Sequence, residues 1–405
     1  MQLWILYLLF FSLPFQIRLL LVGGVNEYQS VFLYGTDILI ALLFFTAVEK
    51  RRFSSPLFLP ALLLIGWLLL SSIFSQNPLL GFYRTVKIAE FFWLFFYLLL
   101  LSRAVYANAL KILVASGLFQ SVLAIGQFAT QHDLGLRVLG ENILAPDITG
   151  VAKIDVFGEK FIRAYGTFPH PNVLAVFLLF CIFLLFLLVT QKKTRTPIPH
   201  TLYPIPFLIL ALLLTFSRAV IVIGILSLIL WFLFSNDRPW HLTGIFLLSF
   251  FVFGSILFPL LKERASLSLD DQAIALRLAY MENALKAIRE YPILGAGPGQ
   301  FTSFQQPLIK SLASQPWANQ PVHNIYLLLA SEAGIPALFF FCWFLATLFR
   351  SLLQKPQNFL FIIPYSLFLI LALFDHFFLT FQQGALTFWT SLAFSSYFSP
   401  IDKKP

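Results

Sequence analysis

The chain has 405 residues, of which 59% are hydrophobic and only 11% are charged, and its formal net charge is +9 at pH 7. Soluble domains carry about 25% charged residues, so this composition excludes an ordinary soluble globular domain. The apolar runs are continuous and do not alternate with polar residues, which excludes a transmembrane β-barrel and indicates membrane helices.

The apolar runs predict about twelve membrane-spanning helices, because each is close to the length that crosses a bilayer as a helix. The first run contains Pro14 and Arg18 and lacks a small-residue cleavage site, so we interpret it as a retained helix. Two connections are long, at residues 130–171 and 262–322. We expect an all-α polytopic membrane protein that forms one integral membrane domain, residues 1–405. The expected spans lie near residues 3–22, 30–48, 57–74, 86–102, 109–129, 172–190, 203–216, 218–235, 242–261, 323–347, 359–374 and 383–399.

The basic residues of the short loops predict the orientation of the chain in the membrane. Residues 49–53, residues 191–195 and the C-terminal "DKK" carry lysine and arginine, whereas the opposite short loops hold few. Cytoplasmic loops are enriched in these residues. We therefore expect both termini in the cytoplasm and both long loops outside.

The end of the first long loop, "RAYGTFPHPNVLAV", combines an arginine and a histidine with turn residues. Its glycine and prolines predict an ordered turn, and Asn172 is a plausible cap for the next helix. A cap-and-turn role explains much of the motif. Arg163 and His170 remain as candidate functional residues.

Arg218 lies in "LTFSRA", where two expected spans meet with almost no loop between them. A snorkelling arginine at the membrane boundary is one interpretation. The alternative is a fixed guanidinium that binds an anion, because arginine holds phosphate through a bidentate fork.

The second long loop is expected to contain an amphipathic helix on the outer face, resting on the membrane or against the bundle. Apolar residues recur at helical spacing from Ile274 to Ile288, and Arg277 lies beside this apolar face. Gly295 and the glycines that follow end the helix in "PILGAGPGQF".

His323 lies at the expected outer mouth of the tenth span, and Glu332 follows within that span. A histidine titrates near pH 6.5 and can act as a general base, so we expect activity to fall on the acid side near that pH. Nine residues of straight helix place Glu332 about 13 Å deeper and on the opposite face, so we interpret it as a structural carboxylate. Gly334 and Pro336 could bend the helix and change this relation.

These pieces together resemble the superfamily of bacterial O-antigen ligases and O-antigen polymerases, most clearly over residues 160–385. The motifs that carry the resemblance are "RAYGTFPHPNVLA", "LTFSRA", "RLAYMENALKAIREYPILGAGPGQF", "HNIYLLLASEAGIPAL" and "FDHFFLTFQQG". The superfamily uses a glycan linked to undecaprenyl pyrophosphate and transfers it at the outer face of the cytoplasmic membrane. The resemblance implies an inverting glycosyltransferase with no metal and no cofactor, whose partners are the lipid-linked donor, a glycan or lipid-glycan acceptor and membrane lipid, but no nucleic acid.

The resemblance also implies roles for individual residues. His323 matches the catalytic base, and Arg218 and Arg277 match arginines that bind the pyrophosphate. Arg163 and His170 match a recurrent motif with a less defined part in substrate binding.

Two other functions remain open at this point. A polymerase would pass the glycan to a second lipid-linked repeat unit, whereas a ligase passes it to a terminal acceptor such as the core of lipopolysaccharide. A flippase or transporter also fits twelve spans with buried charges. It is less favoured because transporters often consist of two related halves, and no such repeat is visible in the sequence.

Overall fold

The computed structural model describes residues 1–47, 55–156, 158–190, 204–234, 240–265, 272–306, 318–354 and 359–396. The basic short loops at residues 49–53 and 191–195 and the C-terminal lysines lie outside the described residues.

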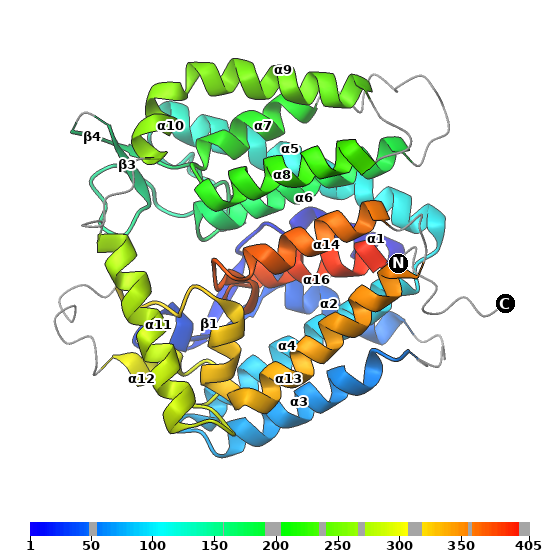
Figure 1. Ribbon diagram of the computed structural model, residues 1–405, viewed down its shortest axis with the longest axis vertical. Helices are drawn as coiled ribbons and strands as arrows, with labels where there is room; N and C mark the ends of the chain where they lie inside the picture. The colour runs from blue at the N-terminus through cyan, green and yellow to red at the C-terminus, as the bar shows by residue number, and fades with distance from the viewer. Residues whose placement is uncertain are drawn as a thin grey trace. The chain divides into compact units, whose positions relative to one another are not determined.

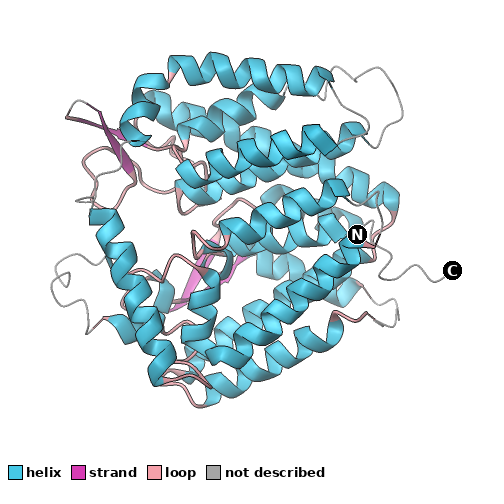
Figure 2. Ribbon diagram, in the orientation of Figure 1, coloured by secondary structure: helices cyan, strands magenta, loops and turns pink. Residues whose placement is uncertain are grey.

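The described chain is mostly helical, as the sequence predicts, and its strands are confined to two short ribbons (Figure 2). Three described helices are long and apolar enough to cross a membrane: Arg103–Thr130, Pro171–Leu188 and Ile325–Leu353. Trp240–Ile256 and Phe258–Arg264 pass the same test together, as a pair bent by 78°. The remaining apolar helices are shorter. The structure therefore confirms a helical membrane protein, and the number of twelve crossings stays a prediction.

The chain divides into two compact units (Figure 1). The first unit comprises Met1–Arg18, Tyr34–Ala47 and Leu101–Leu267. Its elements are α1 (Gln2–Ser12), α2 (Gly35–Thr46), α5 (Arg103–Thr130), η2 (Arg137–Leu139), β3 (Lys153–Val156), β4 (Glu159–Ile162), α6 (Pro171–Thr190), α7 (Pro204–Leu214), α8 (Arg218–Phe234), α9 (Trp240–Ile256) and α10 (Phe258–Ala265).

The long connection in this unit is folded onto α5 by buried amides. Gln127 of α5 donates to the Gly166 carbonyl and to Glu141 Oε1, at 2.9 and 2.7 Å. Glu141 in turn accepts the N–H groups of Leu134 and Leu136. Because a buried polar group must find a partner, these bonds fix the course of residues 130–171.

Two expectations about secondary structure need correction. The first expected span is helical only over Gln2–Ser12, because Pro14 stops the helix, and the chain continues as β1 (Arg18–Val22). β1 pairs with β2 (Val31–Tyr34), and β3 pairs with β4 in antiparallel register, Lys153 opposite Ile162. The chain is therefore not purely α-helical. Both ribbons are short, and period-2 patterns of four or five residues are hard to distinguish inside an apolar sequence.

The second unit comprises Leu19–Leu33, Val48–Leu100 and Ser268–Pro405. Helices α3, α4, α13 and α16 pack against one another, and α11 runs across α13 instead of along it (Figure 1). The elements are η1 (Glu27–Gln29), α3 (Phe58–Ile73), α4 (Pro78–Leu99), α11 (Gln272–Glu290), α12 (Phe301–Gln305), α13 (Ile325–Leu353), α14 (Phe359–Leu371), α15 (Phe377–Thr380) and α16 (Gln382–Ser396).

Helix α13 is bent at Gly334, which has φ 81° and ψ 172°, two residues before Pro336. The glycine-rich loop 291–300 fills this bend. The Gly297 N–H donates to the Glu332 carbonyl at 2.8 Å. This carbonyl lies near the break in the helix, and the loop supplies its hydrogen-bond donor. The bend that the sequence suggested at Gly334 is therefore confirmed, and it holds the loop that precedes the helix.

Candidate functional site

The candidate residues fall into the two units, and we describe each group by itself. In the first unit Arg163 is 4% exposed, and its guanidinium donates to one backbone carbonyl and to one side chain. Its Nε donates to the Thr215 carbonyl at 2.6 Å, and its Nη2 donates to Asn172 Oδ1 at 2.7 Å. Arg163 therefore joins the loop, the start of α6 and the end of α7.

His170 acts at the start of α6, where a cap was expected from Asn172. The His170 Nδ1 accepts the Asn172 N–H at 3.1 Å, while the Asn172 side chain accepts from Arg163. The ring of His170 also lies edge-on to Tyr165, with 6.2 Å between the centroids. These contacts support a local structural role for His170.

Arg218 is the first residue of α8, directly after a tight turn, as the sequence predicts. The turn passes through Phe216, whose φ of 47° is unusual for a residue other than glycine. Arg218 is half-buried, and its Nη1 donates to the Arg264 carbonyl at 3.2 Å. Arg163 binds the same turn at Thr215, so an arginine from another element also holds the turn that precedes Arg218.

In the second unit His323 immediately precedes α13. Asn324 caps that helix, and its Oδ1 accepts the N–H groups of Tyr326 and Leu327 at 2.9 and 3.0 Å. The His323 Nδ1 is buried and has no hydrogen-bond partner among the described residues. His323 therefore has a ring nitrogen that the surrounding fold does not use.

A second histidine and a carboxylate lie beside His323. The rings of His323 and His376 are 4.8 Å apart between centroids, at 76°. Asp375 precedes His376 and accepts its backbone N–H at 2.9 Å. The His376 Nδ1 shares a hydrogen bond of 2.8 Å with the hydroxyl of Thr380, and this bond fixes the orientation of the ring.

Asp375 and His376 received no specific role from the sequence, although their motif "FDHFFLTFQQG" contributes to the resemblance. A carboxylate and a histidine in succession between two apolar helices are a signal that could have been used, because both are costly there. Their proximity to His323 could not be read from spacing, since more than fifty residues separate the two segments.

Helix α11 provides the other two contacts of His323. Tyr280 lies almost parallel to the imidazole, with 5.9 Å between centroids and 5° between planes, and its hydroxyl donates to the Ala318 carbonyl. Arg277 is on the same helix and is exposed. Arg277 lies one helical turn before Tyr280, so it is on the part of α11 that contacts the histidine.

The environment lowers the pKa of His323 from 6.5 to about 4. Burial is the main cause, because it disfavours the charged imidazolium. The Asp375 carboxylate opposes this shift by raising the pKa, and the Arg277 guanidinium adds to it. At neutral pH His323 is therefore neutral, which is the form that can accept a proton.

His323, Asp375 and His376 also form a group, among the described residues, whose donor atoms could approach a metal ion. One donor atom from each lies within 4.8 Å of the others. Tetrahedral ligands at a zinc bond length of about 2.1 Å lie about 3.4 Å apart, so the group would have to contract to bind zinc. The arrangement as it stands suits proton transfer better.

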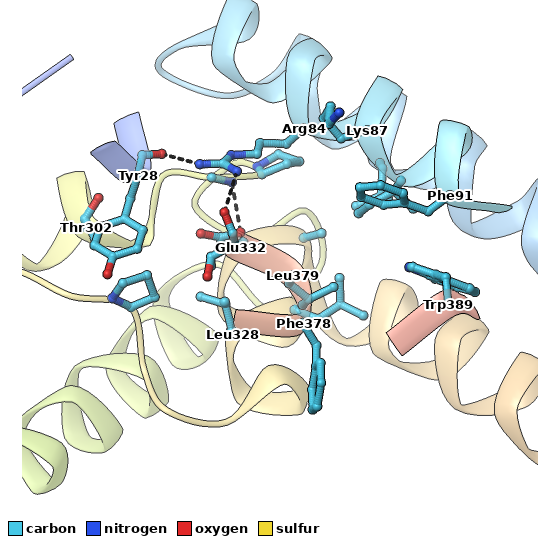
Figure 3. A pocket seen from close by; sticks show the side chains of 18 residues that line it. Tyr28, Arg84, Lys87, Phe91, Thr302, Leu328, Glu332, Phe378, Leu379 and Trp389 are labelled. Atoms are coloured by element: carbon cyan, nitrogen blue, oxygen red, sulfur yellow. Dashed lines mark hydrogen bonds between the residues drawn. The ribbon is translucent and has the colours of Figure 1, made fainter. Parts of the chain in front are cut away.

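A cavity in the same unit adjoins these residues and is lined by charged side chains of the membrane helices (Figure 3). Arg84 of α4 donates to the carbonyls of Tyr28 and Thr380, at 2.7 and 3.3 Å. It therefore ties together two segments that both contact the ring of His376.

The carboxylate of Glu332 points toward Arg84 in this cavity (Figure 3). It accepts the N–H groups of Gly299 and Phe301, at 2.9 and 3.2 Å. Glu332 thus has the structural role that the sequence analysis assigns to it, and its partners come from the glycine-rich loop. Elsewhere on α4, Lys87 forms an ion pair of 2.8 Å with Glu90.

Comparison with known families identifies the central part of the chain. Residues 204–342 match the family model described as O-antigen ligase, which confirms the resemblance. Arg218, Arg277 and His323 lie inside this match, whereas Arg163 and the Asp375–His376 pair lie outside it. A comparison with curated proteins gave no match.

Proposed function

We infer that this chain, whose residues 204–342 carry an O-antigen ligase domain, transfers a glycan from undecaprenyl pyrophosphate to a hydroxyl group of an acceptor. The family supports a membrane glycosyltransferase that acts on lipid-linked glycans. The finer statements, on the donor, the acceptor and the membrane, are proposals. In this proposal the protein resides in the bacterial cytoplasmic membrane and crosses it about twelve times, with both long loops and the active site outside.

The single observation that carries the proposal is the neutral, buried His323 with an unbonded ring nitrogen beside the Arg277 cation. The acceptor hydroxyl oxygen attacks the anomeric carbon and forms the new glycosidic bond. The bond from that carbon to the pyrophosphate oxygen breaks, and its electrons leave with undecaprenyl pyrophosphate. The hydroxyl proton moves to His323.

The arginines serve the leaving group. Negative charge develops on the pyrophosphate as the glycosidic bond breaks, and guanidinium groups stabilise such charge in a dry site. Arg277 is exposed and beside His323, which supports direct contact with the phosphates. Arg218 is assigned the same task on the basis of its motif. Arg163 and His170 are proposed to hold the turn that carries Arg218, because their bonds are to that region.

Asp375 and His376 are proposed as positioning residues. When His323 takes the proton, it becomes an imidazolium in a buried site, and the Asp375 carboxylate stabilises that charge. His376 is clamped by Thr380 and packs edge-on against His323, which limits the orientations of the base.

The proposal is tested by single-turnover transfer from purified lipid-linked glycan in nanodiscs. His323→Ala should slow transfer by about 10²–10⁴-fold, which is the usual contribution of a general base, while donor binding stays near normal. Arg277→Ala should weaken both donor binding and transfer. His170→Ala is the control, because its effect on the chemical step should be smaller. Wild-type transfer by His323→Ala, or a defect confined to donor binding, would exclude this role.

A polymerase acting on two lipid-linked repeat units is the alternative within the same chemistry, because the donor site is shared. Deleting the gene separates the two: a ligase defect leaves full-length unattached polymer, and a polymerase defect leaves single lipid-linked repeats. A lipid-linked glycan flippase is less favoured, since transport gives no reason for a buried base beside an exposed cation.

A further inference from the structure

Helix α11 has two apolar faces, and one of them packs against other described residues of its own unit. Tyr280, Ala284 and Ala287 are at most 2% exposed. Tyr280 and Ala284 belong to a buried cluster with Leu328 of α13. These small and aromatic residues recur at spacings of four and three, so they form one stripe along the helix.

The second apolar face is open. Leu278, Met281 and Leu285 are 56%, 44% and 44% exposed, and their spacing of three and four places them on one stripe. Ile293, 62% exposed, follows directly after the helix. This stripe belongs to the apolar face from which the sequence predicts an amphipathic helix, and it is not the face bound to α13.

Arg277 lies at the border between the two faces. At about 100° per residue it is some 40° from Met281, on the side that leads to Tyr280. Its side chain is exposed, and it lies one helical turn before Tyr280, whose ring is stacked on the His323 ring with 5.9 Å between the centroids. The open apolar stripe therefore begins next to the cation that faces the reaction centre.

The exposed apolar stripe and the guanidinium of Arg277 together indicate the kind of ligand that binds here. A ligand that binds a guanidinium with its head and an apolar stripe with its tail is a phosphate-bearing lipid, because phosphate and arginine are complementary and hydrocarbon gains from burial. The stripe extends away from the residue beside the base, so a tail that lies on it brings the phosphate, and not the tail, toward His323. The donor in the proposed function has this construction.

We propose that the exposed stripe formed by Leu278, Met281 and Leu285 of α11 binds the first isoprenyl units of the lipid donor while Arg277 holds its pyrophosphate. The proposal rests on the proposed function for the identity of the donor. It makes α11 a lipid-binding element, in addition to supplying a cation.

Binding is tested first, independently of transfer. Leu285→p-benzoylphenylalanine in protein reconstituted in nanodiscs with undecaprenyl pyrophosphate should give, on irradiation, a mass increase equal to this lipid. The matched control is Glu290→p-benzoylphenylalanine, about 140° around the same helix from Leu285 and also exposed, which should give no such product. Phospholipid crosslinks in place of undecaprenyl pyrophosphate, or equal products at both positions, would overturn the proposal even if transfer is confirmed.

Transfer then tests the consequence for the donor. The same glycan is supplied on undecaprenyl pyrophosphate and on methyl pyrophosphate, a short donor that has no isoprene unit. The double variant Leu278→Gln and Leu285→Gln should raise KM for the long donor about tenfold with little change in kcat, because two apolar contacts are lost. KM for the short donor, which cannot reach the stripe, should hardly change, and Glu290→Gln should behave as wild type with both.

Three outcomes of the transfer experiment contradict the inference. They are an equal rise in KM for both donors, no rise for either, and a rise that added anionic phospholipid reverses. If wild type transfers from neither donor, the proposed function fails, and the crosslinking experiment still decides whether α11 binds the lipid.

Discussion

At the residue scale, several polar side chains inside this protein form hydrogen bonds that join segments of the backbone, and others are candidates for the reaction. Arg84, Arg163 and Glu332 each bind two groups of the protein, and every bond described for them serves to join segments. The Nδ1 of His323 has no partner among the described residues, and neither has the Nε of Arg84, so an unbonded buried atom does not by itself distinguish a reactive residue. His323 is distinguished by its place beside His376 and Tyr280.

The pH dependence of the reaction follows from the burial of His323. The pKa of this side chain is lowered to about 4, so the base stays deprotonated at all higher pH values. Activity should therefore be lost only as pH falls through about 4, and not near the reference value of 6.5. Asp375→Asn removes the charge that raises this pKa, so its acid limb should move to still lower pH. The measurement is kcat/KM against pH in nanodiscs, and an acid limb near 6.5 in wild type would contradict the assignment.

The sequence could select His323 and Arg218 by a motif and a place at a helix end, and Arg277 by its place beside the apolar face of an amphipathic helix. It could not show which of the charged residues bind backbone, since a carboxylate that accepts two amide N–H groups looks the same in sequence as a catalytic one. Asp375 and His376 were missed for a related reason. Their significance depends on a contact with His323 that only the packing of distant segments creates.

At the scale of elements, the bend in α13 and the loop that fills it form one unit of structure. Gly334 has a positive φ, and a Cβ placed there would overlap the Ile293 carbonyl oxygen. Gly295 approaches the same helix from the loop side, where a Cβ would overlap the Glu332 backbone. The glycines and the proline are visible in the sequence, and they indicate the possibility of a bend. The sequence does not show that the loop 291–300 packs into this bend. A glycine needed for close approach and a glycine needed for a turn look the same in a sequence.

Gly334→Ala should destabilise the protein by at least about 1–3 kcal/mol, the usual cost of a side chain in this backbone region, with the contact to Ile293 adding to it. Gly66→Ala is the matched control. Gly66 lies inside α3, where an added Cβ would meet nothing within 4 Å, so alanine there should be neutral or slightly stabilising. The measurement is thermal unfolding in detergent, and equal melting temperatures for the two variants would show that the bend tolerates a side chain.

At the scale of the whole molecule, the predicted orientation can be tested at described and exposed positions. Lys160→Cys, in the first long loop, should react with a membrane-impermeant maleimide in cells whose outer barrier has been opened. Ala104→Cys, at the start of α5, should react only after the cytoplasmic membrane is disrupted. Both variants need Cys342→Ser, because Cys342 is exposed, whereas Cys181 is buried. The reverse pattern would place the His323 site in the cytoplasm and exclude a periplasmic transferase.

Composition alone was enough to predict a helical membrane protein, because long continuous apolar runs with so little charge satisfy their backbone in lipid only as helices. The bounds of α8 and the end of α11 also followed from turn and period signals in the sequence, whereas α13 extends to Leu353, beyond the expected end at residue 347. The number of crossings did not, because several apolar helices are shorter than a bilayer requires and one expected span is bent by 78°. Hydropathy measures how apolar a segment is, and it carries no information on where packing bends or shortens a helix.

The two hydrogen bonds that the Glu332 carboxylate accepts from the glycine-rich loop have a consequence for the synthesis of the protein. This carboxylate binds amide groups that lie 31 and 33 residues earlier in the chain, so its partners have already been synthesised when α13 leaves the ribosome. Asp375 and His376 come later than α13. A nascent chain that ends just after α13 therefore already contains the amide groups that bind Glu332. It does not yet contain Asp375 and His376, which are proposed to position His323. In the proposed function, the group formed by His323, Asp375 and His376 is therefore complete only after the segment that follows α13 has been synthesised.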